Sequence, residues 1–74
     1  MNTKLLNDKI KSIQIPLSEI AEIIGISQKS LCMKISEKRP FMMSEVEKIS
    51  YILKLSKDEK IEIFFPEEDD NSTH

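Results

Sequence analysis

The chain has 74 residues, of which 39% are hydrophobic and 32% charged, and its formal net charge is -2. This length fits one small domain, and this composition is typical of a globular protein rather than a wholly disordered one. The single cysteine, Cys32, excludes an intrachain disulfide, and no apolar run is long enough for a membrane span or a signal peptide. We therefore expect a cytoplasmic protein.

A first helix is predicted close to the N-terminus. Asn2 or Thr3 can cap it, because both side chains accept hydrogen bonds from free backbone N–H groups. Its apolar residues recur at helical spacing: Leu6, Ile10 and Ile13. Pro16 ends the connection that follows and suits the first turn of the next helix.

Residues 17–37 predict a helix, a tight turn and a second helix. The inward face of the first of these helices carries four apolar residues: Leu17, Ile20, Ala21 and Ile24. Gly25, the only glycine of the chain, follows the last of them, where a helix commonly ends in a left-handed conformation. The turn is therefore expected at Gly25.

The second helix, predicted over residues 28–37, begins after Ser27, whose hydroxyl suits an N-cap. Leu31 and Ile35 are spaced to hold it on the core. Four of its side chains are then expected to face outward: Gln28, Lys29, Met33 and Lys34.

Two further helices are predicted after a loop over residues 37–43. Ser44 with Glu47, and Ser56 with Glu59, have the spacing of capping boxes that open them. The fourth helix has an inward stripe of four residues: Val46, Ile49, Ser50 and Leu53. The fifth carries Ile61 and Phe64 and ends at Pro66. Residues 67–74 contain four consecutive acids and no apolar residue, so we expect a domain over 1–66 and a disordered acidic tail.

The spacing Ala21-x3-Gly25-x5-Leu31 resembles the helix-turn-helix of lambda-repressor-like, Cro-type domains, also called the XRE family. The segments 34–41, 44–49, 53–59 and 64–65 resemble the remaining helices of small phage-type repressors, so the resemblance covers roughly residues 3–65. It implies an all-α, compact five-helix domain that binds double-stranded DNA as a homodimer, with helix 28–37 in the major groove.

In such a complex the N-terminal end of helix 28–37 approaches the bases first. Four residues are then candidates for base contacts: Gln28, Lys29, Ser30 and Met33. Five residues are candidates for contacts to the DNA backbone: Ser18, Ser27, Lys34, Lys38 and Arg39. The family usually carries a phosphate-binding glutamine where this chain has Leu17, so that contact is either missing or supplied by Ser18. The glycine usual after the recognition helix is replaced by the segment 36–38.

The charge is unevenly distributed along the chain. Residues 1–40 hold seven basic and four acidic residues, a net charge of +3, whereas residues 41–74 hold four basic and nine acidic residues, a net charge of -5. The candidate DNA-binding half is therefore mildly positive. We expect modest affinity per monomer and a strong dependence on dimer formation and on salt.

More apolar side chains follow the motif than five short helices can bury. The candidates for an exposed apolar patch that binds a second copy are Met42, Met43, Tyr51, Ile63 and Phe65. We expect no cofactor, metal or small-molecule effector, because the chain lacks an effector domain and a glycine-rich phosphate loop. An enzyme is not expected, because no acid, base and nucleophile are spaced for catalysis.

Two functions remain open at this point. The first is a DNA-binding transcriptional regulator, a repressor of phage or mobile-element type, that excludes polymerase from a promoter. The second is a protein-interaction module on the same fold, such as an antirepressor, antitoxin or inhibitor, which the low net charge favours.

Overall fold

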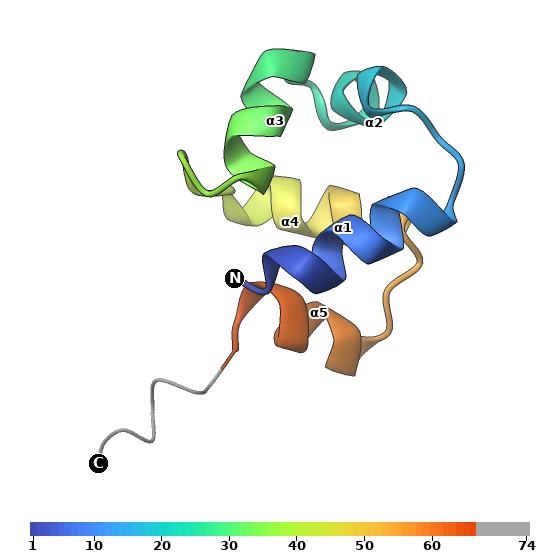
Figure 1. Cartoon of the computed structure of the whole chain (residues 1–74), viewed down its shortest axis with the longest axis vertical. Coiled ribbons are helices and arrows are strands. Elements are labelled where there is room, and N and C mark those ends of the chain that lie inside the picture. The colour runs from blue at the N-terminus through green and yellow to red at the C-terminus, as the bar shows by residue number, and fades with distance from the viewer. Residues whose placement is uncertain (67–74) are drawn as a thin grey trace.

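Five α-helices joined by short loops make up residues 1–66, the part of the chain that the computed structural model describes (Figure 1). They are α1 (Thr3–Ser12), α2 (Leu17–Ile24), α3 (Gln28–Ile35), α4 (Met43–Ile52) and α5 (Lys57–Phe64). No strand occurs in this part, so the predicted all-α class with five helices is confirmed. None of the five helices has the length and apolarity needed to cross a bilayer. The acidic tail predicted over 67–74 lies outside the described residues.

Side chains close the N-terminal ends of α1 and α5. Asn2 Oδ1 accepts a hydrogen bond from the Leu5 N–H at 3.1 Å, so Asn2 rather than Thr3 caps α1. The Ser56 hydroxyl accepts from the Glu59 N–H at 3.1 Å, and the Glu59 carboxylate accepts from the Ser56 N–H at 2.9 Å. This reciprocal pair is the capping box predicted for the fifth helix.

The start of α4 differs from the prediction. Met42 is the N-cap residue and the helix begins at Met43, so the predicted capping box of Ser44 with Glu47 is wrong. Glu45 takes the place expected for Glu47, because its carboxylate accepts from the N-cap N–H of Met42 at 2.8 Å. The predicted inward stripe of α4 is confirmed, since all four of its residues are buried: Val46, Ile49, Ser50 and Leu53.

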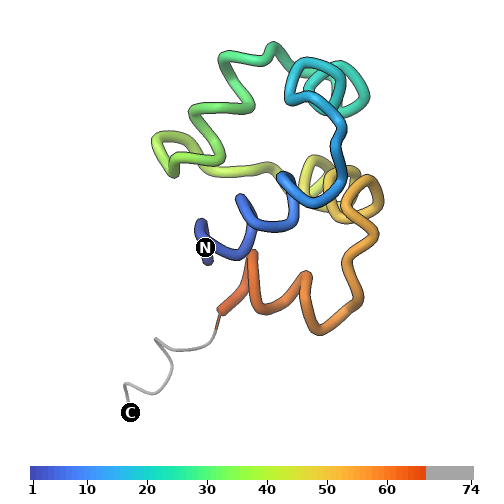
Figure 2. The backbone as a smooth tube through the Cα atoms, turned by 45° about the vertical axis from the view of Figure 1, so that its right-hand side comes forward, coloured from blue at the N-terminus to red at the C-terminus, as the bar shows by residue number. Residues whose placement is uncertain are grey.

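Apolar side chains from all five helices form one core, to which Leu53, the residue that follows α4, also contributes. Its buried members are Leu6, Ile20, Ala21, Ile24, Leu31, Ile35, Ile49, Leu53 and Ile63. α2 packs against α3 and α4, and α1 packs against α3 and α5. Figures 1 and 2 show the result: α2 and α3 lie together at one end of the described part and α5 lies at the other.

α5 buries Ile63 rather than Ile61. Ile63 is 0% exposed, whereas Ile61 is 38% exposed. The backbone explains this orientation, because the carbonyl of Ile63 accepts from the Asn2 N–H at 2.7 Å and so fixes this turn of α5 against the start of α1. The prediction that Ile63 belongs to an exposed dimer patch is therefore wrong.

Two ion pairs join α5 to its neighbours. Lys9 Nζ on α1 lies 2.6 Å from a Glu59 carboxylate oxygen, and Lys60 Nζ lies 2.6 Å from a carboxylate oxygen of Glu47 on α4. Partly exposed pairs of this kind contribute about 0–1 kcal/mol each to stability. The apolar contacts of Ile63, which is fully buried, and of Phe64, which packs against the core, therefore contribute more to holding α5 in place than these ion pairs do.

Candidate nucleic-acid interface

The turn between α2 and α3 is made by Gly25. It has φ 97° and ψ 25°, the left-handed conformation that its position predicted. Its N–H and that of Ile26 both donate to the carbonyl of Ala21, at 2.8 and 3.0 Å. A Cβ added at Gly25 would meet no atom within 4 Å, so the glycine is needed for its backbone conformation and not for space.

The start of α3 is capped as predicted. Ser27 has extended dihedrals, φ -74° and ψ 158°, and its hydroxyl accepts from the Ser30 N–H at 3.0 Å. Leu31 and Ile35 are buried and fix α3 on the core. The first turn of α3 consequently lies at the end of the molecule that is remote from α5 (Figure 1).

The predicted base contacts differ in exposure. Gln28 and Lys29 are exposed at the start of α3, whereas Ser30 and Met33 are partly buried. A helix of eight residues is about 12 Å long. Gln28 and Lys29 are therefore the side chains that the first turn of α3 presents most fully to an approaching molecule.

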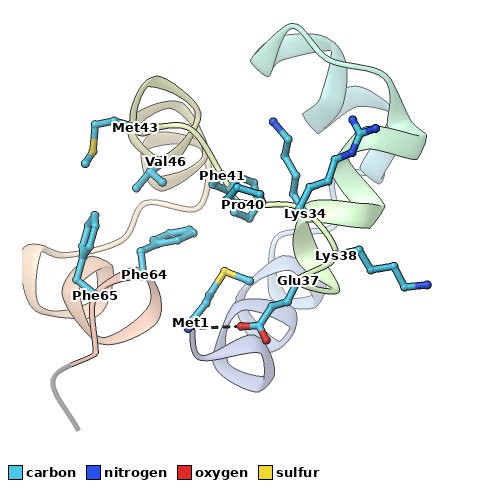
Figure 3. Close-up of a pocket in the computed structure, with 11 residues that line it drawn as sticks. Met1, Lys34, Glu37, Lys38, Pro40, Phe41, Met43, Val46, Phe64 and Phe65 are labelled. Atoms are coloured by element: carbon cyan, nitrogen blue, oxygen red, sulfur yellow. Dashed lines mark ion pairs between the residues drawn. The ribbon is translucent and has the colours of Figure 1, made fainter. Parts of the chain in front are cut away.

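The predicted contacts to the DNA backbone fall into separate places. Ser18 is exposed in the first turn of α2, and Ser27 is exposed at the turn before α3. Lys38 and Arg39 are exposed in the loop after α3, and no ion pair within residues 1–66 engages either of them. Figure 3 shows the Lys38 side chain directed away from the neighbouring aromatic residues. The exposed residues predicted to contact the DNA backbone therefore lie on both sides of α3 in the chain, Ser18 and Ser27 before it and Lys38 and Arg39 after it.

Lys34 does not face outward, so the prediction of an outward-facing side chain at this position is wrong. Its side chain is 10% exposed, and its Nζ donates to Glu45 Oε1 at 2.5 Å. The reason is helical phase: Lys34 follows Leu31 by three residues and adjoins Ile35, so its stem flanks the buried stripe of α3. Its charge is compensated inside the protein.

Glu45, which the sequence analysis did not single out, is the partner of that charge. Its side chain is 9% exposed, and Oε1 accepts from both Lys34 Nζ and the Met42 N–H. Burial raises the pKa of the Glu45 carboxyl, but the hydrogen bonds from Lys34 and Met42, together with the positive charges of Lys34 and Lys48, lower it by more, and the net pKa lies below its usual value. One signal was present in the sequence: Glu45 precedes Ile49 by four residues on the inward stripe of α4.

The end of α3 adopts a left-handed turn without glycine. Glu37 has φ 67°. The Lys38 N–H donates to the carbonyl of Met33 at 2.8 Å, and the Glu37 N–H donates to that of Lys34 at 3.1 Å. The Glu37 carboxylate also lies 3.4 Å from the Met1 amine (Figure 3). The chain thus forms at Glu37 the left-handed turn that commonly ends a helix at a glycine.

An open groove of about 510 Å³ lies beside this loop (Figure 3). Phe41 and Phe64 meet edge to face within its lining, with ring centroids 5.6 Å apart and planes at 86°. Met43 and Phe65, two predicted members of the dimer patch, also line it. Met43 and Phe65 are exposed, as are the patch candidates Met42 and Tyr51.

No family model, curated protein or solved structure matches this chain. Within residues 1–66 no three His, Cys, Asp or Glu side chains come together as a possible metal site. The candidate interface consists of a capped, exposed helix start and two exposed cations, Lys38 and Arg39, in the loop that follows.

Replacing Gly25 with alanine should lower the free energy of unfolding by about 1–2 kcal/mol, because a Cβ disfavours a left-handed residue. Gly25→Asn should cost less, since asparagine tolerates this conformation better than alanine does. Urea unfolding of the three chains at neutral pH measures the difference. Equal stability of the alanine variant and the parent would contradict the conformational role of Gly25.

Lys34→Met should lower the free energy of unfolding by about 3 kcal/mol, because it leaves the Glu45 carboxylate buried without its cation. The double variant Lys34→Met/Glu45→Gln should recover most of this loss, since no buried charge remains. Urea unfolding of both single variants and the double variant gives the coupling energy. Additive effects of the two substitutions would contradict a direct ion pair.

The free energy of unfolding, measured in urea as above, should depend on pH through Glu45. Because the folded-state pKa of Glu45 is lowered, its contribution to stability is present above the unfolded pKa of about 4.3 and is lost as pH falls through the lower folded value. The double variant should lose less stability than the parent in this window.

Proposed function

We propose that the protein is a sequence-specific DNA-binding transcriptional regulator, a repressor of the phage or mobile-element type with a lambda-repressor-like fold. The observation that supports this most directly is the α2–turn–α3 unit. Gly25 and Ser27 fix the turn and the helix start, and the first turn of α3 exposes an amide and an ammonium group, on Gln28 and Lys29. In the proposed complex, the first turn of α3 is the part of the recognition helix that approaches the base edges in the major groove.

The exposed fractions of the side chains divide the proposed contacts into central and marginal ones. Gln28 is suited to a bidentate contact with adenine, and Lys29 to guanine or a phosphate. Ser30 and Met33, which are partly buried, lie at the margin of this surface. The proposed phosphate contacts are made by Ser18, Ser27, Lys38 and Arg39, without Lys34.

Repression then acts by competition. A homodimer that occupies two half-sites about 34 Å apart, one turn of DNA, would exclude polymerase from a promoter. The proposed contact between the two copies uses the exposed apolar residues Met42, Met43, Tyr51 and Phe65. Two copies would double the number of phosphate contacts that one protomer provides.

A salt titration tests this function. Binding to a pool of random duplex DNA should weaken between about 50 and 200 mM salt, because phosphate contacts release counterions. Lys38→Gln removes one phosphate contact from each protomer and should reduce the slope of log K against log salt by about 1.8 for a bound homodimer, whereas Lys57→Gln on α5, which lies remote from α3, should leave the slope unchanged. Fluorescence anisotropy of labelled duplexes measures both. No binding by the parent chain at the lower salt would contradict the proposal and favour the protein-interaction module.

Gln28→Ala should relax the preference at one base position, at a cost of about 1–3 kcal/mol for the preferred site. Selection from a randomised duplex pool, followed by sequencing, gives the preference at each position. Glu62→Ala on α5 is the control and should select the parent's sites. If Gln28→Ala also selects those sites with unchanged strength, the proposed orientation of α3 is wrong.

A further inference from the structure

The loop between α3 and α4, residues 36–42, carries the exposed cations Lys38 and Arg39 on a backbone that is hydrogen-bonded at both ends. At its start, the Lys38 and Arg39 N–H groups both donate to the carbonyl of Met33, at 2.8 and 3.3 Å. At its end, the Met42 N–H donates to Glu45 at 2.8 Å. The position of the two cations therefore depends on both ties.

A single carboxylate oxygen makes the second tie. Glu45 Oε1 accepts from Lys34 Nζ at 2.5 Å and from the Met42 N–H, so it joins the last turn of α3, the end of the loop and the first turn of α4. The two side chains are only 10% and 9% exposed. The charge of Lys34 is consequently compensated by Glu45 and not available for a phosphate.

We propose that Lys34 and Glu45 are positioning residues for the DNA backbone contacts of Lys38 and Arg39, an inference that rests on the proposed DNA-binding function. Without the ion pair the loop keeps its tie to Met33 but loses the link between its far end and α3. Lys38 and Arg39 then sample more conformations, and the entropy lost on ordering them opposes binding.

The double variant Lys34→Met/Glu45→Gln isolates this effect. It leaves the net charge unchanged, keeps the aliphatic stem at position 34, and retains an amide oxygen that can accept from the Met42 N–H. We expect a folded chain whose affinity for duplex DNA falls about 5- to 20-fold at fixed salt, with the slope of log K against log salt unchanged. Lys34→Arg, which keeps the ion pair, should bind within about twofold of the parent.

A second readout needs no DNA. Order parameters from 15N relaxation of the amides of Lys38, Arg39, Phe41 and Met42 should fall from about 0.85 towards 0.6 in the double variant, whereas those of Gln28 to Leu31 should not change. Unchanged order parameters, an unchanged affinity, or a salt slope reduced as much as Lys38→Gln reduces it would each overturn the positioning role. A parent chain that binds no duplex would instead overturn the proposed function, while the relaxation data would still decide whether the pair fixes the loop.

Discussion

The reversal of the chain at Gly25 is the constraint on which the arrangement of the helices depends. α2 ends where its apolar stripe ends, and α3 must start within a few residues with its own stripe facing the same core. Two residues separate the helices after Gly25, so the direction change rests on one left-handed residue and the cap that Ser27 supplies. The same geometry that buries Ile24 and Leu31 therefore leaves the first turn of α3 exposed.

The ends of α2 and α3 solve one backbone problem with different residues. Gly25 adopts the left-handed conformation without steric cost, whereas Glu37 adopts it at φ 67° with a cost of about 1–2 kcal/mol. The hydrogen bonds of Glu37 and Lys38 to the carbonyls of the last turn of α3 offset part of this cost. Conformation at Glu37 is thus imposed by the surrounding contacts and not by the residue's own preference.

Local patterns in the sequence predicted what depends on local physics. Apolar spacing predicted the burial of Leu31 and Ile35, and the chemistry of small polar side chains predicted the caps at Ser27 and Ser56. These features need only a few neighbouring residues. The five-helix class follows from them because each apolar stripe requires a partner.

The predictions that were wrong concern residues that contact distant parts of the sequence or that have unusual partners. Lys34 was expected in solvent because lysine usually is, yet its stem flanks the buried stripe and its charge meets Glu45 on the next helix. The choice between Ile61 and Ile63 depends on the Asn2 N–H, sixty-one residues from Ile63 in the chain. Periodicity within one helix can place a residue beside a buried stripe, but it does not identify the residue of another helix that this residue contacts.

The burial of Lys34 also changes the electrostatics of the proposed interface. Three cations, Lys29, Lys38 and Arg39, remain exposed at or after α3 and free of ion pairs within residues 1–66. Three phosphate contacts give one protomer weak binding and a shallow salt dependence. A homodimer would make about six phosphate contacts, which give an appreciable loss of affinity as salt rises over the physiological range. On the proposed function, a chain with so few available charges must obtain its affinity from two copies bound together, and each of its cations must be held where a phosphate will be.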